Sequence, residues 1–285
     1  MVVLDDLSAG RLDNLALLNP RGRLKLVKGD VRDATTVRKA LKDVDTVFHL
    51  AALVSVQAGV KDPKRMRDIN SNGTKTLLEG SAACSVDRFV FASSAAVYGA
   101  LSPPLRESRA PSPISAYGQS KLEGEAHCRR FFEEFGVGTV SLRYFNAYGP
   151  RSREGAESGV ITRFARRLTN GERPVIYGNG LQTRDFVEVR DIVEASIRAA
   201  THPRSPGKTY NVGTGRPTTI LGLLRLEAEL LGIRKQLRTL RKPARKADIQ
   251  KSCADIGLIR KELGYSPSVS LREGLAGYLK WLQRD

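Results

Sequence analysis

The segment RFVFASSAAVYG at residues 88–99 is followed by AYGQSK at residues 116–121, and these two stretches decide the fold. The first is an apolar run that predicts a buried strand ending at Ser94. A hydroxyl at the carboxyl end of a parallel strand lies where such sheets bind ligands and can hydrogen-bond a reacting oxygen. The second stretch predicts a helix on which Tyr117 and Lys121, four residues apart, project from one face.

Tyr117 and Lys121 are a candidate acid–base pair. A phenol titrates near pH 10 and is a poor base at neutral pH, but an ammonium group held nearby favours its phenolate and lowers its pKa. Such a phenolate can remove a hydroxyl proton while a hydride leaves the same carbon. The Y-x-x-x-K spacing by itself occurs in many chains, where an exposed helix pair is the better interpretation. The surrounding motifs decide between a catalytic pair and an exposed helix pair.

Strand-like and helix-like segments alternate along the first half of the chain. Caps indicate the helices: Asp33 precedes one, Asn70 opens another that runs to Cys84, and Ser115 precedes a third that stops at Gly136. The alternation is typical of a parallel α/β sheet. The strand-like segments are VVLD (2–5), RLKLVKGD (23–30), DTVFHLAA (45–52), RFVFASS (88–94) and GTVSLRYFN (138–146).

The composition is that of a globular protein with an excess of positive charge. Of 285 residues, 47 are Lys or Arg and 30 are Asp or Glu, for a formal net charge of +17. This excess suits either a nucleic-acid binder or an enzyme for a polyanionic small molecule. The basic residues are scattered, and only RKPARK at residues 241–246 is a dense cluster, which disfavours nucleic acid as the main partner.

Other broad classes of protein are also disfavoured. No apolar run approaches the roughly 18–20 residues of a membrane helix, and the N-terminus lacks the pattern of a secretory signal, so we expect a cytoplasmic protein without membrane association. The three cysteines, Cys84, Cys128 and Cys253, are far apart in the sequence. Their number and spacing predict neither a disulfide framework nor a metal site.

Ordered motifs along nearly the whole chain resemble those of one family, the extended short-chain dehydrogenase/reductases, and in particular the NAD-dependent epimerase/dehydratase proteins that are similar to UDP-glucose 4-epimerases. The resemblance implies an α/β fold with a Rossmann-type doubly wound parallel sheet and a smaller α/β substrate-binding domain. The motifs are VVLDDLSAG (2–10), KGDVRD (28–33), VFHLAA (47–52), INSNGT (69–74), SSAAVYG (93–99), YGQSK (117–121), LRYFNAYGPR (142–151), IYGNGLQTRDFVEVRDIV (176–193), YNVGTG (210–215) and KELGYSP (261–267).

The resemblance implies NAD as the cofactor and assigns roles to residues around it. Tyr117 resembles the catalytic base, Lys121 the residue that binds the nicotinamide ribose, and Ser94 the third catalytic member. Asp5 resembles the acid that accepts hydrogen bonds from the adenosine ribose, which favours NAD over NADP. We interpret His49 as a packed strand residue. The other residues that the resemblance places at the cofactor are Asp30, Val31, Leu50, Ala51, Ala52 and Asn70.

A nucleotide-diphosphate sugar is the substrate that the resemblance implies. Asn146 resembles a contact to the diphosphate, and Arg184, Arg245 and Asp248 resemble the group that holds the phosphates and ribose, for which the planar fork of arginine is suited. Ser252 stands at the position beside the sugar 2-substituent. A small residue there predicts that N-acetylated sugars are accepted.

The sequence favours 4-epimerisation among the reactions of this family. Relatives that dehydrate or decarboxylate the sugar carry a glutamate where this chain has Ala96. Without that group we expect Tyr117 to take the 4-hydroxyl proton while hydride passes from C4 to NAD, with hydride return to the opposite face of a 4-keto sugar. Two alternatives stay open: another nucleotide-sugar oxidoreductase or epimerase of this fold, and a non-catalytic nucleotide-binding or RNA-associated homologue.

The resemblance also predicts how the chain is divided. We expect an NAD-binding domain formed by residues 1–148 and 182–208, and a nucleotide-sugar-binding domain formed by residues 149–181 and 209–285. The ribose-binding acid follows the glycine fingerprint by about 20 residues, so the resemblance places the first βα unit, with the glycine-rich loop, before residue 1. We therefore expect weak NAD binding and uncertain activity from the chain as written. A homodimer is also implied, formed by the helices that contain Tyr117 and Asn70.

Overall fold

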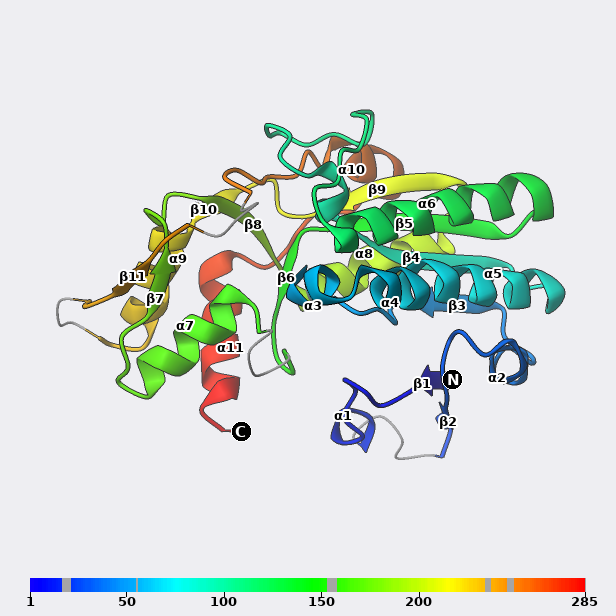
Figure 1. The fold of residues 1–285 in the computed structure, drawn as a ribbon, viewed down its shortest axis with the longest axis horizontal. Coiled ribbons are helices and arrows are strands. Elements are labelled where there is room, and N and C mark those ends of the chain that lie inside the picture. The colour runs from blue at the N-terminus through cyan, green and yellow to red at the C-terminus, as the bar shows by residue number, and fades with distance from the viewer. Residues whose placement is uncertain (17–21, 55, 153–157, 234–236, 245–248, 285) are drawn as a thin grey trace. The chain divides into compact units, whose positions relative to one another are not determined.

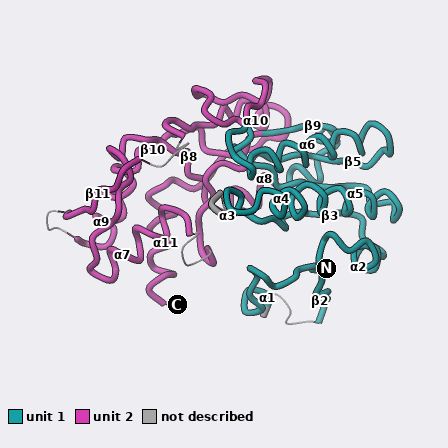
Figure 2. The backbone as a smooth tube through the Cα atoms, viewed as in Figure 1, with its two compact units in different colours: residues 1–97, 113–143, 196–210 teal, residues 98–112, 144–195, 211–285 magenta. Residues whose placement is uncertain are grey.

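The computed structural model describes residues 1–16, 22–54, 56–152, 158–233, 237–244 and 249–284. The chain forms two compact units, which Figure 2 colours separately. The predicted domains differ from these units mainly in the assignment of residues 98–112 and 182–195. The prediction concerns which ligand each part binds, and it stays a prediction. Unit 1 is residues 1–97, 113–143 and 196–210, and unit 2 is residues 98–112, 144–195 and 211–285.

Unit 1 contains parallel strands, as the alternating pattern predicts. A four-stranded sheet has the order β3-β4-β5-β9, and β1 pairs with β2 in a parallel two-stranded sheet (Figure 1). β3 and β4 are parallel, with Thr46 opposite Arg88. The strands are β1 (Val2–Asp5), β2 (Lys25–Lys28), β3 (Thr46–His49), β4 (Arg88–Ser94), β5 (Gly138–Tyr144) and β9 (Lys208–Val212), the last of which continues into unit 2.

Two of the predicted helix caps are confirmed. The Asp33 side chain accepts a hydrogen bond from Thr35 N at the start of α2 (Ala34–Ala40). The Ser115 side chain accepts one from Gly118 N at the start of α6 (Ala116–Phe135). α6 ends at Gly136, whose φ of 70° is the left-handed conformation that glycine adopts at helix ends.

The prediction that Asn70 opens a helix is wrong. The helical segment begins earlier, with α4 (Pro63–Arg67), where the Asp62 side chain caps Arg65 N and proline occupies the first turn. It continues through a π-helical turn, η1 (Asp68–Asn72), into α5 (Gly73–Ala83). Asn70 lies inside this turn and its side chain bonds to other segments, so it does not cap a helix.

The core of unit 1 lies between β3 and β4 and the helices α2, α5 and α6. α5 and α6 pack beside each other, and α6 packs on β4. Apolar side chains from each element fill the space between them. The buried members are Val37, Leu41, Val47, Leu77, Leu78, Val86, Phe89, Phe91, Cys128, Phe131 and Val137.

Unit 2 has two small sheets with helices around them. In one sheet β8 pairs antiparallel with β10 and parallel with β6, and in the other β7 pairs in parallel with β11. α9 begins at the Thr219 cap, and α11 begins at a capping box formed by Ser270 and Glu273. The strands are β6 (Asn146–Tyr148), β7 (Val175–Tyr177), β8 (Thr183–Glu188), β10 (Pro217–Thr219) and β11 (Leu240–Lys242).

The helices of unit 2 enclose its apolar core. The buried residues include Phe164 of α7, Leu223 of α9 and Tyr278 of α11. α8 begins in unit 2 and ends in unit 1. The bounds of the α-helices in this part of the chain are α7 (Val160–Thr169), α8 (Val189–Thr201), α9 (Ile220–Leu230), α10 (Gly257–Leu263) and α11 (Leu271–Leu282).

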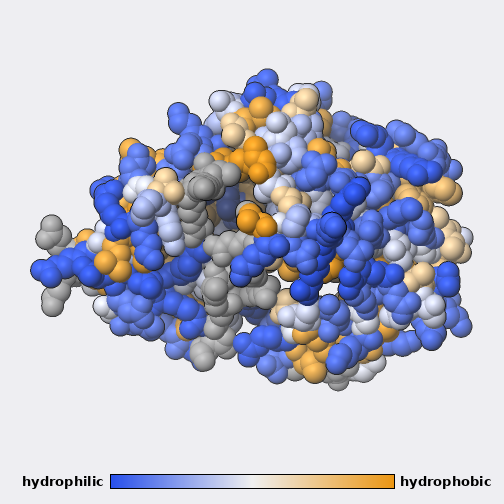
Figure 3. All heavy atoms as spheres, in the orientation of Figure 1, coloured by the Kyte–Doolittle hydropathy of each residue, from blue (hydrophilic) through white to orange (hydrophobic). Residues whose placement is uncertain are grey.

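The surface is mainly polar on the face that Figure 3 shows, with small separated apolar areas. Within the described ranges, none of the helices combines the length and the apolar character that a membrane crossing requires.

Candidate active site

The contact between α6 and β4 places two of the predicted catalytic residues. Lys121 is buried, and its Nζ donates a hydrogen bond to the Ala92 carbonyl at 2.8 Å. The same Nζ lies 4.9 Å from the centre of the Phe91 ring and 5.9 Å from that of Tyr117. Burial lowers the pKa of Lys121 to about 8. The group therefore titrates closer to neutral pH than an exposed lysine does.

The Ser94 hydroxyl at the end of β4 lies near enough to the Tyr117 phenol to act on its pKa, and Lys121 Nζ lies near the Tyr117 ring, so the structure brings the three predicted catalytic residues together. Burial raises the pKa of Tyr117, and Ser94 acts in the opposite direction. The net direction is opposite to the one expected from the neighbouring lysine, because desolvation of the phenolate outweighs the effect of Ser94.

Two glycines allow α6 to approach β4 and the turn that follows it this closely. A Cβ atom at Gly124 would lie 2.4 Å from the Phe91 ring, and one at Gly118 would lie 2.5 Å from the Ala96 carbonyl oxygen. Glycine lowers helix stability by about 1 kcal/mol relative to alanine, so its presence here is explained by packing. This close approach was not predicted, although two glycines within a predicted helix are a visible signal of one.

A buried ion pair lies one helical turn beyond Lys121. Glu125 of α6 accepts hydrogen bonds from Arg143 of β5, from Nε to Oε1 at 2.9 Å and from Nη2 to Oε2 at 2.7 Å. The Ser93 hydroxyl also donates to Glu125 Oε1, at 2.5 Å. This group joins α6, β4 and β5 beside the catalytic residues, since Ser93 adjoins Ser94, and it is not among the predicted site residues.

The end of β1 suits the ribose of a dinucleotide. Asp5 is half-buried, and among the described residues its carboxylate accepts one hydrogen bond, from Leu7 N to Oδ1 at 2.7 Å. A Cβ atom at Gly10 would lie 2.9 Å from both carboxylate oxygens, so a larger residue there would cover the acid. The local geometry fits an acid that accepts hydrogen bonds from a ligand.

The residues predicted on the adenine side have different surroundings. The Asp30 carboxylate binds Arg32 through Nε at 3.0 Å and Nη2 at 2.6 Å, and this hydrogen bonding lowers the pKa of Asp30. Arg32 also pairs with Asp68. Val31 is buried. The Asp30 side chain is therefore already engaged, and its backbone is the part best able to contact a ligand.

The segment after β3 is open, whereas Asn70 is fully engaged. Leu50 and Ala51 are exposed and Ala52 is half-buried, which suits residues that lie under a cofactor. The Asn70 amide bonds to both backbone groups of Leu53, with Leu53 N donating to Oδ1 at 2.7 Å and Nδ2 donating to Leu53 O at 3.0 Å. The Asn70 side chain therefore supports this segment through the protein itself.

Apart from Ser94 of unit 1, the predicted substrate residues that the structure describes belong to unit 2. Asn146 is exposed on β6, opposite Phe186 of β8. Arg184 is half-buried on β8, and its Nη1 donates to the Thr183 and Ile249 carbonyls at 2.8 and 2.5 Å. Ser252 is buried, with 6% of its surface exposed. Arg245 and Asp248 lie outside the described residues.

Asp185, next to Arg184, organises the surrounding segments, although it is not among the predicted site residues. It is fully buried. Its carboxylate accepts hydrogen bonds from Thr214 N at 2.8 Å, Thr214 Oγ1 at 2.5 Å, Gly215 N at 2.9 Å and Ala254 N at 3.1 Å. The acid thus holds the glycine turn after β9 and the chain after residue 249 around Arg184.

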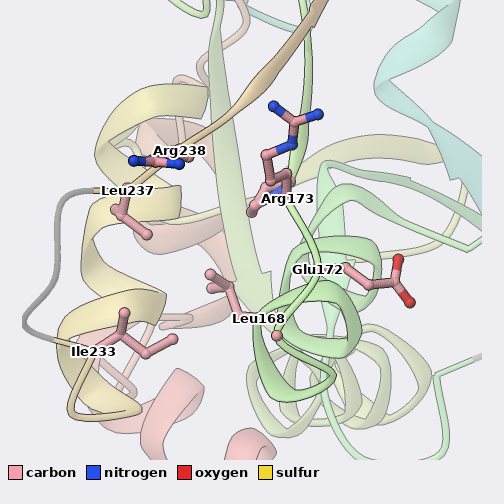
Figure 4. A pocket seen from close by; sticks show the side chains of 8 residues that line it. Leu168, Glu172, Arg173, Ile233, Leu237 and Arg238 are labelled. Atoms are coloured by element: carbon pink, nitrogen blue, oxygen red, sulfur yellow. The ribbon is translucent and has the colours of Figure 1, made fainter.

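A separate pocket in unit 2 contains none of the predicted site residues. Its volume is about 420 Å³. In Figure 4 the aliphatic side chains of Leu168, Ile233 and Leu237 surround it, while the Glu172 carboxylate points away. The pocket therefore gives no support to any of the predicted roles.

The described residues contain no group of three or more His, Cys, Asp or Glu side chains that could hold a metal ion. Cys84, Cys128 and Cys253 are free thiols. Burial raises the pKa of Cys253 to about 11 and that of Cys128 still further. Thiols with raised pKa values are poor nucleophiles.

Comparisons with known proteins agree with this geometry. Residues 2–213 match the model of the NAD dependent epimerase/dehydratase family. A putative UDP-glucose 4-epimerase of Methanocaldococcus jannaschii is 33% identical over 288 residues, covering 100% of this chain and 91% of that protein.

Solved structures show the same similarity. The UDP-glucose 4-epimerase of Thermotoga maritima, crystallised with UDP-glucose, superposes with a TM-score of 0.93 at 35% identity, covering 99% of this chain and 90% of that one. The UDP-N-acetylglucosamine 4-epimerase of Methanobrevibacter ruminantium, in complex with UDP-N-acetylmuramic acid, has the same TM-score, identity and coverage.

Proposed function

Because this chain belongs to the NAD-dependent epimerase/dehydratase family, we propose that it is a nucleotide-sugar 4-epimerase that acts through a transient 4-keto sugar. The observation that supports this most directly is the grouping of Ser94, Tyr117 and Lys121 at the end of β4. A hydroxyl, a phenol and an ammonium group in this arrangement can move one proton at a sugar hydroxyl.

NAD, when bound, supplies the acceptor and donor of a hydride, so that the reaction has no net redox change. Tyr117 would remove the proton from the 4-hydroxyl and later return it. Ser94 would hydrogen-bond the reacting oxygen, and Lys121 would hold the ribose and favour the phenolate. Asp5 would accept hydrogen bonds from the adenosine ribose. Asp30, Val31 and Leu50–Ala52 would line the cofactor.

The substrate residues are proposed on the chemistry of their side chains. Arg184 and Arg245 would bind the diphosphate, Asn146 would contact it, and Asp248 would contact the ribose, which agrees with the nucleotide sugars bound by similar structures. Ser252 would lie beside the sugar 2-substituent. The predicted domain division follows from these roles.

Epimerisation is favoured over elimination by the turn after β4. Ala95 and Ala96 begin this turn, η2 (Ala95–Tyr98), and neither can act as an acid or base. Dehydration needs a further group that removes or donates a proton at a neighbouring carbon. The second candidate is another nucleotide-sugar oxidoreductase or epimerase of this fold. It stays open because the chain is also similar to a protein that acts on a different sugar, the UDP-N-acetylglucosamine 4-epimerase.

We also propose that the protein is a cytoplasmic homodimer that pairs through α5 and α6, since these helices pack side by side along one face of unit 1. Size-exclusion chromatography with light scattering would measure its mass in solution.

The function is tested by incubating the protein with NAD and a panel of UDP-, GDP- and dTDP-sugars, followed by NMR of the products. The expected product is the C4 epimer of the sugar, with the nucleotide intact. A 6-deoxy-4-keto product or net reduction of NAD would favour the second candidate. No turnover of any sugar, together with tight binding of nucleotide, would indicate a non-catalytic homologue.

A further inference from the structure

A buried chain of hydrogen bonds begins at His49, the last residue of β3. The imidazole is 2% exposed, and its Nε2 lies 2.8 Å from the Thr74 hydroxyl of α5. Thr74 is fully buried, and its hydroxyl donates to the Asn70 carbonyl at 2.6 Å. Asn70 lies in the π-helical turn η1, a distortion that is often found at functional sites.

The direction of this chain follows from counting protons. A threonine hydroxyl has one proton, and here it is used in the bond to the Asn70 carbonyl. The oxygen of Thr74 can therefore only accept from His49, so the Nε2 atom must carry the imidazole proton. Burial lowers the pKa of His49 to about 3, with the charge of Lys121 acting in the same direction, so the ring is neutral at physiological pH.

The chain divides at Asn70 into two branches. One consists of the two hydrogen bonds to the backbone of Leu53, directly after the open segment Leu50–Ala52. The other runs from Asn70 Nδ2 to the Ser120 hydroxyl at 3.0 Å, and from that hydroxyl to the Tyr117 carbonyl at 2.8 Å. One turn of backbone thus contacts both the proposed cofactor segment and the helix of the proposed base.

The imidazole is held in place by aromatic neighbours. Its centre lies 5.7 Å from the Phe91 ring, in a stacked arrangement, and 5.8 Å from the Phe89 ring, in a tilted one. A phenylalanine would fill this space nearly as well, so packing alone does not require a nitrogen here. The hydrogen bond to Thr74 is what a histidine adds.

We propose that His49 is a positioning residue, which acts through Thr74 and Asn70 to hold the cofactor segment at Leu53 and the backbone of Tyr117 in a fixed relation. The inference rests on the proposed function for its catalytic consequence, but the hydrogen-bond chain itself can be tested without any substrate. His49 touches no reacting atom in this scheme.

Matched variants separate the hydrogen bond from the packing. His49→Phe keeps an aromatic ring and removes the donor, whereas His49→Gln keeps an N–H donor at a similar reach. Thr74→Val keeps the shape and removes the hydroxyl, whereas Thr74→Ser keeps the hydroxyl. Because His49 and Thr74 belong to one chain of hydrogen bonds, we expect the effects of His49→Phe and Thr74→Val on hydrogen exchange to be non-additive when the two are combined.

The first measurement is hydrogen exchange of the Leu53 amide in the protein without ligands, with the amides of β5 as the reference. In His49→Phe and Thr74→Val we expect exchange at Leu53 to increase about five- to tenfold, the effect of one weakened hydrogen bond, with β5 unchanged. His49→Gln and Thr74→Ser should stay near wild type. Unchanged exchange at Leu53, or an equal increase at β5, would overturn the proposal.

The second measurement is the NAD concentration needed for half-maximal epimerisation. We expect it to rise in His49→Phe and Thr74→Val and to recover in His49→Gln and Thr74→Ser. Half-saturation that is unchanged in all four variants would overturn the link to the cofactor. If wild type turned over no sugar, the proposed function would fail while the exchange result still decided the hydrogen-bond chain. If His49→Phe did not fold, Thr74→Val would decide it.

Discussion

Glu125 and Arg143 form a two-point ion pair inside unit 1, with side chains that are 8% and 6% exposed. The pair lies one turn from Lys121, and Ser93 completes the hydrogen bonding of the carboxylate. Two charges this far from water are tolerated because each has its partners, so removing one leaves the other uncompensated.

We therefore expect Arg143→Met to lower the free energy of unfolding by about 3–5 kcal/mol. Urea denaturation measures this. The double variant Glu125→Leu with Arg143→Met removes both charges and should recover much of the loss. An equal loss in the single and double variants would show that packing, and not the unpaired charge, is responsible.

Tyr117→Phe is expected to reduce kcat by at least about 10²-fold, because general-base catalysis commonly contributes about 10² to 10⁴-fold. Substrate binding should be nearly unchanged, since the ring still packs. Steady-state kinetics with NMR detection and calorimetry of nucleotide-sugar binding measure the two effects. A variant that keeps more than about a tenth of the wild-type kcat would exclude Tyr117 as the base.

Gly124→Ala should destabilise the protein by about 1–3 kcal/mol, because the new methyl group meets the Phe91 ring at 2.4 Å. Gly277→Ala is the matched control: it lies in α11 with no atom within 4 Å of the added carbon. There alanine should stabilise by up to about 1 kcal/mol through its helix propensity. Thermal melting compares the two variants. If both variants shifted Tm in the same direction, the close approach of α6 to Phe91 would not be what requires glycine at position 124.

Glu227 is predicted to make stability fall as pH rises. It is fully buried on α9, and neither carboxylate oxygen has a hydrogen-bond partner among the described residues. Burial raises its pKa well above the ordinary value of 4.5. The folded protein therefore keeps the proton on Glu227 to a higher pH than the unfolded chain does, so the contribution of Glu227 to stability is most favourable below pH 4.5 and is lost as pH rises towards the folded pKa.

The variant Glu227→Leu should accordingly gain stability relative to wild type, by about 1–3 kcal/mol at pH 8 and by less at pH 4. Unfolding free energies at the two pH values measure the difference. A gain that does not depend on pH would show that Glu227 does not titrate in this range.

The small residue at position 252 predicts that UDP-N-acetylglucosamine is accepted at least as well as UDP-glucose. Values of kcat/KM for the two substrates decide this. Because Ser252 is buried, Ser252→Tyr should reduce activity on the acetylated sugar more than on glucose, provided that the variant melts within a few degrees of wild type. Rejection of the acetylated sugar by an active wild-type enzyme would contradict the assignment of this position.

Local signals in the sequence determined the limits of α6 and the catalytic spacing. Ser115 and Gly136 act on backbone groups within a few residues, so α6 could be placed from its ends. The separation of Tyr117 from Lys121 fixes both on one face of any helix. The parallel α/β pattern and the family could also be read, because motifs along the chain keep their spacing.

Only the tertiary structure decided how these elements are held together. Glu125 and Arg143 are 18 residues apart, and Asn70 and Ser120 are 50 apart. Pairing at such distances depends on which helix face meets which strand, and periodicity does not specify this. Asn70 shows the difference: an asparagine before a helical pattern indicates a cap, but its amide bonds more favourably to Leu53 and Ser120 once the segments pack, because a buried amide must satisfy all its polar groups.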